Sequence, residues 1–354
     1  MTVTLARELL ARLGSERAFF EAPESQLRYI TNSRAKIYTT ARRAATLEAA
    51  KAEREYLERA SVDTLYFTDE AYPQRLLECD DAPAMLYAVG STDLNACRPL
   101  AIVGTRHATP YGLDFVNRLI ADLAEITDSP AIVSGLAYGI DVAAHRAAVS
   151  HGLPTVGVMA TGVNTIYPAD HRATAAEMVR HGGMLLTEYT SAEPVHKGNF
   201  VARNRIVAGL CDCLLVVESA EKGGALITAR LASQYSRDVF ALPGRISDTY
   251  SSGCNRLINR QEAQLITSAA DICAAMNWPV RNSAAGSPVQ AELPLALTAE
   301  EELIVRFLET NENASVSAII SATGLPVTQL MSMLIDMEFR GLLLALPGGI
   351  YRKV

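Results

Sequence analysis

The 354-residue sequence lacks features that mark several classes of protein. Its six cysteines have no paired C-x-x-C spacing, so we expect reduced thiols rather than a disulfide framework or a zinc site. No apolar run approaches the roughly 18 residues of a membrane span, and the charged amphipathic N-terminus does not resemble a secretory signal. A cytoplasmic protein is therefore expected.

Basic charge is also scarce, because 32 Lys and Arg residues face 39 Asp and Glu residues. The resulting net charge of −7 gives no global attraction for nucleic acid, so any site for a polyanion has to be local. What the chain does have is apolar content: 49% of its residues are hydrophobic and 20% are charged, which is typical of a folded globular protein.

Periodicity and composition divide the chain into four segments. Residues 1–75 mix Ala and Leu with Arg and Glu, which predicts a small helical domain. Residues 76–276 predict an α/β domain, and residues 277–294 are a linker rich in Pro, Ala, Ser and Gly. Residues 295–354 predict three helices and a hairpin, which together make a winged-helix domain.

Short β-branched or apolar runs in the second segment are separated by stretches long enough for a helix. This repeated βα order predicts a doubly wound parallel sheet, whose ligands bind beyond the carboxyl ends of the strands. The expected strands are Leu100–Val103, Ala131–Val133, Thr155–Met159, Met184–Leu186, Cys213–Val217 and Val239–Leu242.

The segments directly after these strands are polar and rich in glycine. Glycine lets a backbone approach a phosphate closely, and the N–H groups at a following helix N-terminus attract anions. The alternative is that these glycines serve only the tight turns that any such sheet needs. The stretch Gly135 to Gly139 lacks the G-x-G-x-x-G spacing, and the sequence has no G-x-x-x-x-G-K-[ST] loop, so a nucleotide-hydrolysing site is not indicated.

Basic residues near the strand ends strengthen the phosphate interpretation, since a guanidinium binds phosphate bidentately. Arg106 directly follows a strand, and Arg172 lies at an expected helix start, where a positive charge is unfavourable unless an anion binds. Lys197, Arg203 and Arg205 frame another basic stretch. The alternative for each is a solvated surface position, and for Arg203 and Arg205 it is also a structural ion-pair hub.

Catalytic and metal-binding patterns are weaker. Asp141 and His145 are four residues apart on one helix face, as in an acid/base pair or half a metal site, although we favour a structural pairing. Cys211 and Cys213 flank a strand start without a recognisable base. We therefore expect no catalytic residue, no metal and no cofactor.

Several motifs follow one another over about residues 98–268, and their order is more specific than any single loop. They are Val103-Gly104-Thr105-Arg106, Ser134-Gly135-Leu136-Ala137-Tyr138-Gly139-Ile140-Asp141, Gly162 with Tyr167-Pro168, Thr187-Glu188-Tyr189, Phe200 to Ala208, Val216-Val217-Glu218, Phe240-Ala241-Leu242-Pro243-Gly244 and Ser252-Gly253-Cys254-Asn255. Together they resemble the DprA/Smf family, the DNA-processing proteins of bacterial natural transformation.

The resemblance implies an extended Rossmann-like domain that binds single-stranded DNA. It also implies a homodimer that protects incoming DNA and loads RecA recombinase onto it, without catalysis. Arg106 and Arg172 match the arginine of the family's Gly-Ser/Thr-Arg motif and a basic residue shortly after its Tyr-Pro. The expected DNA-binding residues are Gly104, Thr105, Arg106, Ser134, Gly135, Gly162, Arg172, Lys197, Asn199, Arg203 and Asn204.

The two ends of the chain resemble the family's accessory domains with some departures. The helical N-terminus is similar to a sterile-alpha-motif-like domain whose first repeat is short. The C-terminal part is acidic, since residues 277–354 hold five basic and eight acidic residues, and the expected recognition helix Pro326–Phe339 has no Lys or Arg. We therefore expect the winged helix to contact protein or to have a weak, accessory DNA role.

Two other functions remain open from the sequence. The first is a nucleotide-processing enzyme similar to the lysine-decarboxylase-like phosphoribohydrolases, with Glu218 as the residue to test. Their P-G-G-x-G-T-x-x-E motif has only partial counterparts here, at Glu221 to Ala225 and at Pro243-Gly244-Arg245. The second is a pure adaptor that binds proteins through its two ends, which predicts no DNA affinity for the central domain.

Overall fold

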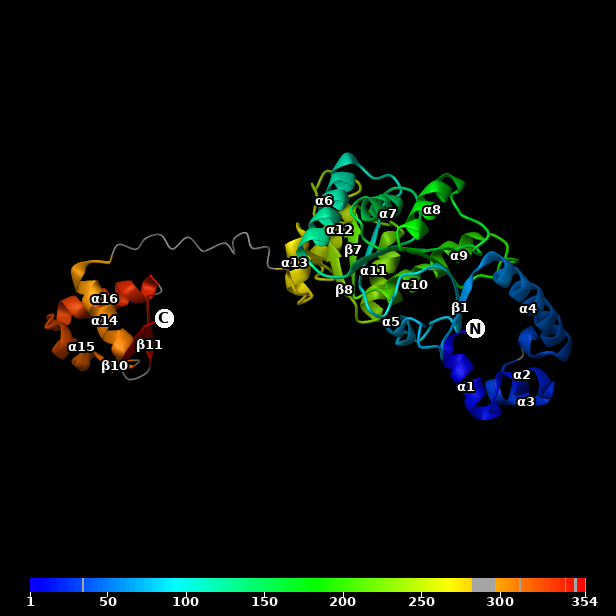
Figure 1. The fold of residues 1–354 in the computed structure, drawn as a ribbon, viewed down its shortest axis with the longest axis horizontal. Helices are drawn as coiled ribbons and strands as arrows, with labels where there is room; N and C mark the ends of the chain where they lie inside the picture. The colour runs from blue at the N-terminus through cyan, green and yellow to red at the C-terminus, as the bar shows by residue number, and fades with distance from the viewer. Residues whose placement is uncertain (34, 282–296, 312, 341, 347–348, 354) are drawn as a thin grey trace. The chain divides into compact units, whose positions relative to one another are not determined.

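The computed structural model of the protein describes residues 1–33, 35–281, 297–311, 313–340, 342–346 and 349–353 (Figure 1). The chain forms two compact units, Met1–Ser283 and Ala284–Val354. Each unit has a hydrophobic core of its own, so the two are described separately.

A nine-stranded sheet runs through the first unit in the spatial order β1-β2-β6-β5-β4-β3-β7-β8-β9. The seven strands from β6 to β9 in this order are parallel, whereas β1 and β2 are antiparallel to their neighbours. The strands are β1 (Asp63–Tyr66), β2 (Met85–Gly90), β3 (Arg98–Gly104), β4 (Pro130–Ser134), β5 (Thr155–Val158), β6 (Met184–Thr187), β7 (Cys213–Val217), β8 (Asp238–Ala241) and β9 (Gln264–Leu265). The predicted parallel α/β sheet is confirmed, with all six predicted strands in it.

Strands β1, β2 and β9 were not predicted, and β1 lies inside the segment 1–75 that was expected to be helical. The long helix Thr40–Ala60 of that segment ends at Ala60, and Asp63–Tyr66 joins the edge of the sheet. The reason is non-local: β1 has only four residues, two of them exposed, and it owes its extended form to pairing with β2.

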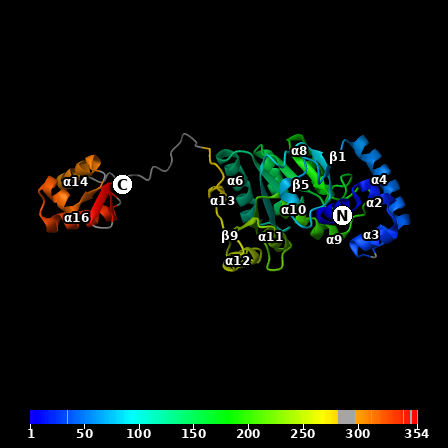
Figure 2. The ribbon, with the colours of Figure 1, turned by 90° about the horizontal axis from the view of Figure 1, so that it is seen from below.

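Helices cover both faces of the sheet (Figures 1 and 2). Helices α6, α7, α8 and α13 pack on one face, and α5, α10, α11 and α12 pack on the other. The helices of the first unit are α1 (Val3–Leu13), α2 (Glu16–Glu21), α3 (Glu24–Thr31), η1 (Lys36–Tyr38), α4 (Thr40–Ala60), α5 (Gln74–Leu77), α6 (Pro110–Ile126), α7 (Ile140–Ser150), η2 (Ala169–His171), α8 (Arg172–Arg180), α9 (Lys197–Ala202), α10 (Asn204–Leu210), α11 (Ala225–Gln234), α12 (Ser252–Asn259) and α13 (Ala269–Ala275).

Alternate residues of β3 pack on opposite faces of the sheet, which explains why the parallel strands are continuous apolar runs in the sequence. Leu100 and Ile102 pack under α6 and α7, while Ala101 and Val103 face α10 and α11. Because both faces are buried, neither set of alternating positions tolerates polar residues. Only the ends of the strands are left for polar function.

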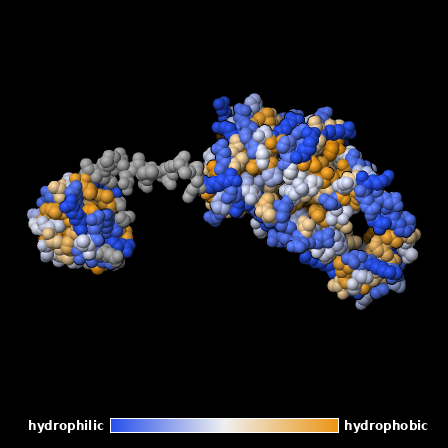
Figure 3. All heavy atoms as spheres, in the orientation of Figure 1, coloured by the Kyte–Doolittle hydropathy of each residue, from blue (hydrophilic) through white to orange (hydrophobic). Residues whose placement is uncertain are grey.

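The N-terminal helices pack around a small core of their own that includes Phe19 and Leu27. Arg43 of α4 is buried and links α4 to residues 19–22. Its guanidinium donates to the carbonyl oxygens of Phe19, Phe20 and Ala22 at 2.5–2.8 Å. In Figure 3, α4 is largely hydrophilic, and hydrophobic side chains gather beside it over the first helices.

Helix α4 also contacts the sheet domain through Glu53. Its carboxylate accepts hydrogen bonds from the backbone amide of Ser191 at 2.8 Å and from the Ser191 hydroxyl at 2.6 Å. Ser191 lies in the loop after β6 that leads to Lys197. The helical part of the unit therefore helps to position a loop at the carboxyl edge of the sheet.

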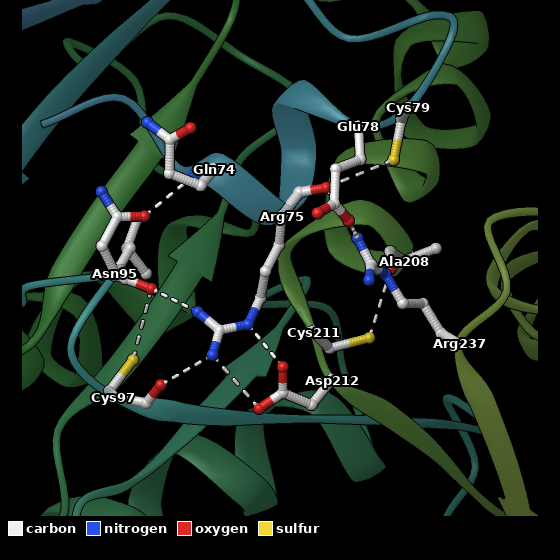
Figure 4. Close-up of polar contacts among 11 residues, drawn as sticks. Gln74, Arg75, Glu78, Cys79, Asn95, Cys97, Ala208, Cys211, Asp212 and Arg237 are labelled. Carbon is white, nitrogen blue, oxygen red and sulfur yellow. Dashed lines mark hydrogen bonds and ion pairs between the residues drawn. The ribbon is translucent and has the colours of Figure 1, made fainter. Parts of the chain in front are cut away.

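The amino edge of the parallel strands is closed by an ion-pair network (Figure 4). Arg75 of α5 binds Asp212, just before β7, with Nε 2.5 Å from Oδ1, and it donates to the carbonyl oxygen of Cys97, just before β3, at 3.0 Å. Arg237, just before β8, in turn donates to the Arg75 carbonyl oxygen at 2.7 Å. The side chains of these arginines are therefore engaged in contacts within the protein. The opposite, carboxyl edge of the parallel strands is the candidate for ligand binding.

The second unit has the winged-helix architecture that the sequence predicted. Three helices pack against a three-stranded antiparallel sheet of order β10-β12-β11. The elements are α14 (Ala299–Thr310), β10 (Ala314–Ser315), α15 (Val316–Thr323), α16 (Val327–Phe339), β11 (Leu343–Leu346) and β12 (Ile350–Lys353). Most of the predicted linker 277–294 and residues 347–348, within the predicted hairpin, lie outside the described residues.

Within the described residues, no single helix is long and apolar enough to cross a membrane. Helix α15 and the segment Val327–Glu338 of α16 reach that length and hydropathy only when taken together, and they are bent by 113° at the break between them.

Candidate nucleic-acid interface

The order of the strands places a crevice between the loops that follow β3 and β7. After β3 the chain builds β4, β5 and β6 on one side, and it then returns to add β7, β8 and β9 on the other. Ligands bind at such a topological switch point because the two loops diverge there. A cleft of about 370 Å³ lies at this position, and the loops at Gly104 to Arg106 and Ser219 to Gly224 contribute to its lining.

The loop after β3 is held in place by Glu218, which directly follows β7. The Glu218 carbonyl oxygen accepts from the Thr105 amide at 2.7 Å, and its carboxylate accepts from the Thr109 amide at 2.9 Å and from the Thr109 hydroxyl. Gly139 packs closely against the same loop: it has φ +76°, and a Cβ at this position would lie 2.2 Å from the Thr105 carbonyl oxygen. Arg106 is thus carried by a fixed loop.

Arg203 is buried at the base of the cleft, with an exposed fraction of 4%. Its guanidinium donates to the carbonyl oxygen of Gly135 at 2.6 Å and to that of Val158. A Cβ at residue 135 would lie 2.5 Å from Arg203 Nη2 and 2.7 Å from Asp141 Oδ2, so only glycine leaves room for both groups. These contacts favour the structural ion hub over a DNA contact for the Arg203 side chain.

The electrostatics of this buried pair leave an excess of positive charge in the cleft. Burial raises the pKa of Asp141, and the Arg203 guanidinium opposes that shift. Burial likewise lowers the pKa of Arg203, with Asp141 opposing the shift and the nearby Arg106 adding to it. Since Asp141 balances Arg203, the charge of Arg106 remains available to an anion.

Three predicted cations are exposed in segments that follow strands of the sheet. Arg106 follows β3 and lines the cleft, Arg172 is the first residue of α8 after β5, and Lys197 is the first residue of α9 after β6. None of the three makes a side-chain hydrogen bond or ion pair to another described residue. An arginine at the start of α8 is opposed by the helix dipole, which a bound phosphate would offset. These residues are the strongest candidates for phosphate contacts.

The other predicted residues divide into two groups. Gly104, Thr105, Gly135 and Asn204 line the cleft with Arg106, as expected. Four others do not line the cleft, and their DNA contacts stay predictions. Three of them are engaged by the fold: Ser134 is buried and donates to the Ile102 carbonyl oxygen at 2.6 Å, Gly162 packs against Thr190, and Arg205 pairs with Glu188 at 2.5 Å. The fourth, Asn199, has a buried side-chain Nδ2 with no hydrogen-bond partner among the described residues.

Sequence reasoning missed the contribution of Tyr250, which lines the cleft from the loop after β8. Its ring stacks on His107 with centroids 6.2 Å apart. Nothing local marks this tyrosine, because its partner lies more than 140 residues earlier in the chain. The rings of Tyr167 and Phe200 meet edge to face with centroids 5.1 Å apart, and Tyr167 is 52% exposed.

The residues considered for catalysis are engaged elsewhere. Asp141 and His145 do not pair with each other as expected, since Asp141 faces Arg203 and His145 Nδ1 lies 2.7 Å from the Thr155 hydroxyl. Burial raises the pKa of the Cys211 thiol to about 12, which leaves it a poor nucleophile. Among the described residues, no three His, Cys, Asp or Glu side chains converge on a possible metal site.

His145 makes the stability of the protein depend on pH. Burial lowers its pKa to about 3, assisted by the charges of Arg203 and His171, whereas an unfolded histidine titrates near 6.5. As pH falls below about 6.5, the unfolded state gains a proton that the folded state cannot take, so stability falls. We expect His145 alone to cost about 2 kcal/mol at about pH 5, measured by urea unfolding at neutral and acidic pH.

The matched variants for this measurement are His145→Gln and His181→Gln, because His181 is exposed. The pH dependence should shrink in His145→Gln and persist in His181→Gln. An equal pH dependence in wild type and His145→Gln would contradict the assignment.

Two cations in the described part of the winged-helix unit are held in short ion pairs. Arg340, at the end of α16, pairs with Glu301 at 2.6 Å and Asp336 at 3.0 Å, and Lys353 pairs with Glu309 at 2.5 Å. Among the described residues, the helix α16 itself carries no Lys or Arg. The candidate interface therefore lies in the first unit.

Comparison with known proteins is consistent with this geometry. A family model described as DNA recombination-mediator protein A matches residues 63–277, and one described as the DprA winged helix domain matches residues 288–349. Protein Smf of Escherichia coli (strain K12) is 34% identical over 303 residues, which cover 84% of this chain and 79% of that protein. DNA processing protein DprA of Streptococcus pneumoniae is 40% identical over 210 residues, covering 59% and 73%.

Two solved structures share the fold. The X-ray structure of DprA from Streptococcus pneumoniae has a TM-score of 0.66 and 34% identity, covering 77% of this chain and 92% of that one. A structure of DNA processing protein A from Helicobacter pylori, whose subject is its single-stranded DNA binding mode, has a TM-score of 0.54 and 31% identity and covers 61% and 95%. Sequence, fold and the order of the motifs therefore agree that the chain belongs to the DprA/Smf family of DNA recombination-mediator proteins.

Proposed function

We propose that the protein binds single-stranded DNA at the carboxyl edge of its sheet. The observation that carries this proposal is a set of three exposed cations, Arg106, Arg172 and Lys197, that have no side-chain partner among the described residues of an acidic chain. Arg106 lines the glycine-rich cleft, and the other two begin α8 and α9, in the segments that follow β5 and β6. The single-stranded DNA binding mode named for the Helicobacter pylori relative supports the same ligand. Phosphates would lie against these cations and the backbone amides of the loops.

This arrangement implies strong salt dependence and little sequence preference. Phosphate contacts release counterions but carry no sequence information. The exposed ring of Tyr167 beside Phe200 suits stacking on a base, which is also tolerant of sequence. Duplex DNA keeps its bases inside the helix, so the single strand is the favoured ligand.

The test is a titration of end-labelled oligothymidine with the full chain at several salt concentrations, with a duplex of the same length as the comparison. We expect saturable, salt-sensitive binding of the single strand and weaker binding of the duplex. The absence of saturable binding at low salt would overturn the proposal and favour the adaptor hypothesis.

We further propose that the protein acts as a cytoplasmic homodimer that protects incoming DNA and loads RecA recombinase onto it during natural transformation. Membership of a family of recombination mediators supports this role, and the six free, buried cysteines suit a reducing compartment. Light scattering tests the dimer. RecA-dependent strand exchange on DNA coated with single-strand-binding protein tests the loading.

Catalysis is not part of the proposed function. Glu218, the candidate of the phosphoribohydrolase alternative, uses its carboxylate to accept hydrogen bonds from Thr109, which is a structural role. Incubation with nucleoside monophosphates should release no base. Turnover in wild type that is lost in Glu218→Gln would instead establish the enzyme hypothesis.

A further inference from the structure

A second cavity continues the candidate DNA site across the outside of the sheet. It is a groove of about 560 Å³ between α6 and α7, and it is separate from the cleft at the switch point. Arg106 lines both cavities, so the two meet at this residue. A ligand that contacts Arg106 can therefore extend into either.

The groove is lined by groups that suit a phosphodiester chain. Arg106, His107, Asn117, Arg146 and Ser150 present donors to it. Among the described residues that line the groove there is no carboxylate, although the protein as a whole has 39 acidic residues against 32 basic ones. Its volume lies in the range of about 300–1,000 Å³ that is usual for ligand sites.

Arg146 is held in a fixed position at this groove. It is exposed on α7, and its Nε donates to the Thr174 hydroxyl of α8 at 3.2 Å. Its two terminal nitrogens have no partner among the described residues, so they remain available to an anion. Asp141, the one carboxylate of α7, is buried and compensated by Arg203, which leaves the exposed surface of this helix basic.

The position of Arg146 connects two residues already assigned to the site. It shares the groove with Arg106, and it contacts α8, the helix that begins at Arg172. We propose that the single strand leaves the cleft through the groove between α6 and α7, with Arg146 as a further phosphate contact. This inference rests on the proposed function and adds to it the path of the strand.

The test compares Arg146→Ala with wild type on oligothymidines of about 4 to 16 nucleotides, a range of site sizes seen in single-strand-binding folds. Arg230→Ala is the matched control, because Arg230 is an exposed arginine on α11, on the other face of the sheet. We expect Arg146→Ala to weaken binding of the longer strands about tenfold and to spare the shortest ones. The slope of log K against log salt should fall by about 0.7, the value for one phosphate on a single strand. Arg146→Lys should keep most of that slope, which a purely structural role would not require.

A second measurement places the strand directly. Ser150 lines the groove and all six native cysteines are buried, so Ser150→Cys accepts a fluorophore selectively. Energy transfer to an oligothymidine labelled at one end should exceed that from Ser233→Cys, an exposed position on α11. Two results would contradict the path through the groove and leave the proposed function standing. One is equal energy transfer from the two labelled positions, and the other is an unchanged salt slope in Arg146→Ala while wild type binds normally. Failure of wild type to bind any strand would remove both.

Discussion

Arg203→Ala is expected to lower the free energy of unfolding by about 3–5 kcal/mol, the usual cost of removing one partner from a buried ion pair. The substitution leaves the Asp141 carboxylate buried without its compensating charge. It also removes the donors that satisfy the carbonyl oxygens of Gly135 and Val158. Urea unfolding of the full chain, followed by circular dichroism, measures the change.

The control for this prediction is Arg172→Ala, because Arg172 is exposed and its side chain makes no hydrogen bond or ion pair with another described residue. Its effect on stability should stay within about 0.5 kcal/mol. Combining Arg203→Ala with Asp141→Ala should cost less than the sum of the two single variants, since neither then leaves a buried charge alone. If Arg203→Ala instead folds as stably as wild type but loses DNA affinity, Arg203 is a DNA contact and the structural assignment is wrong.

The double variant Arg106→Ala/Arg172→Ala is expected to bind oligothymidine about 100-fold more weakly than wild type. Each substitution removes one charge-assisted phosphate contact of about 1.5 kcal/mol, which is roughly tenfold in affinity. Neither arginine has a side-chain hydrogen bond or ion pair within the described protein that the substitution would break. The slope of log K against log salt should fall by about 1.4, which corresponds to two phosphates on a single strand. The titration described above, repeated at each salt concentration, measures both quantities.

A double variant with the same net charge separates local contacts from the overall field. Arg180→Ala/Arg230→Ala also removes two exposed arginines, but Arg180 ends α8 beside Glu177, Arg230 lies on α11, and neither lines the cleft or the groove. Its affinity should remain within a few-fold of wild type. Equal losses in the two double variants would mean that net charge, rather than this site, governs binding.

The location of the candidate site could be predicted because it depends on topology more than on detail. Runs such as Leu100–Val103 and Cys213–Val217 identify buried parallel strands, and the carboxyl ends of such strands lie at one edge wherever the helices pack. The segments that follow them therefore had to meet. Arg106 and Arg172 were found in this way, and the structure leaves both exposed at that edge.

The sequence could not rank the basic residues that it identified. Arg203 is two residues from Arg205 and six from Lys197, yet Lys197 is exposed, Arg203 is buried and Arg205 is paired with Glu188. The partners that decide the role of Arg203, Gly135 and Val158, lie 68 and 45 residues away in the chain. The local sequence pattern of residues 197–205 does not carry that information.

By itself the sequence determined the α/β class, the winged helix, the family and the edge of the sheet that we propose as the DNA site. Each of these follows from local periodicity and from motifs whose order is independent of packing. Only the tertiary structure decided that β1 and β2 extend the sheet, that Glu218 and Arg203 serve the fold, and that a groove at Arg146 adjoins the cleft. The physical reason is that burial and pairing are set by neighbours distant in the chain, and an arginine is free to bind phosphate only where the fold has left its charge unpaired.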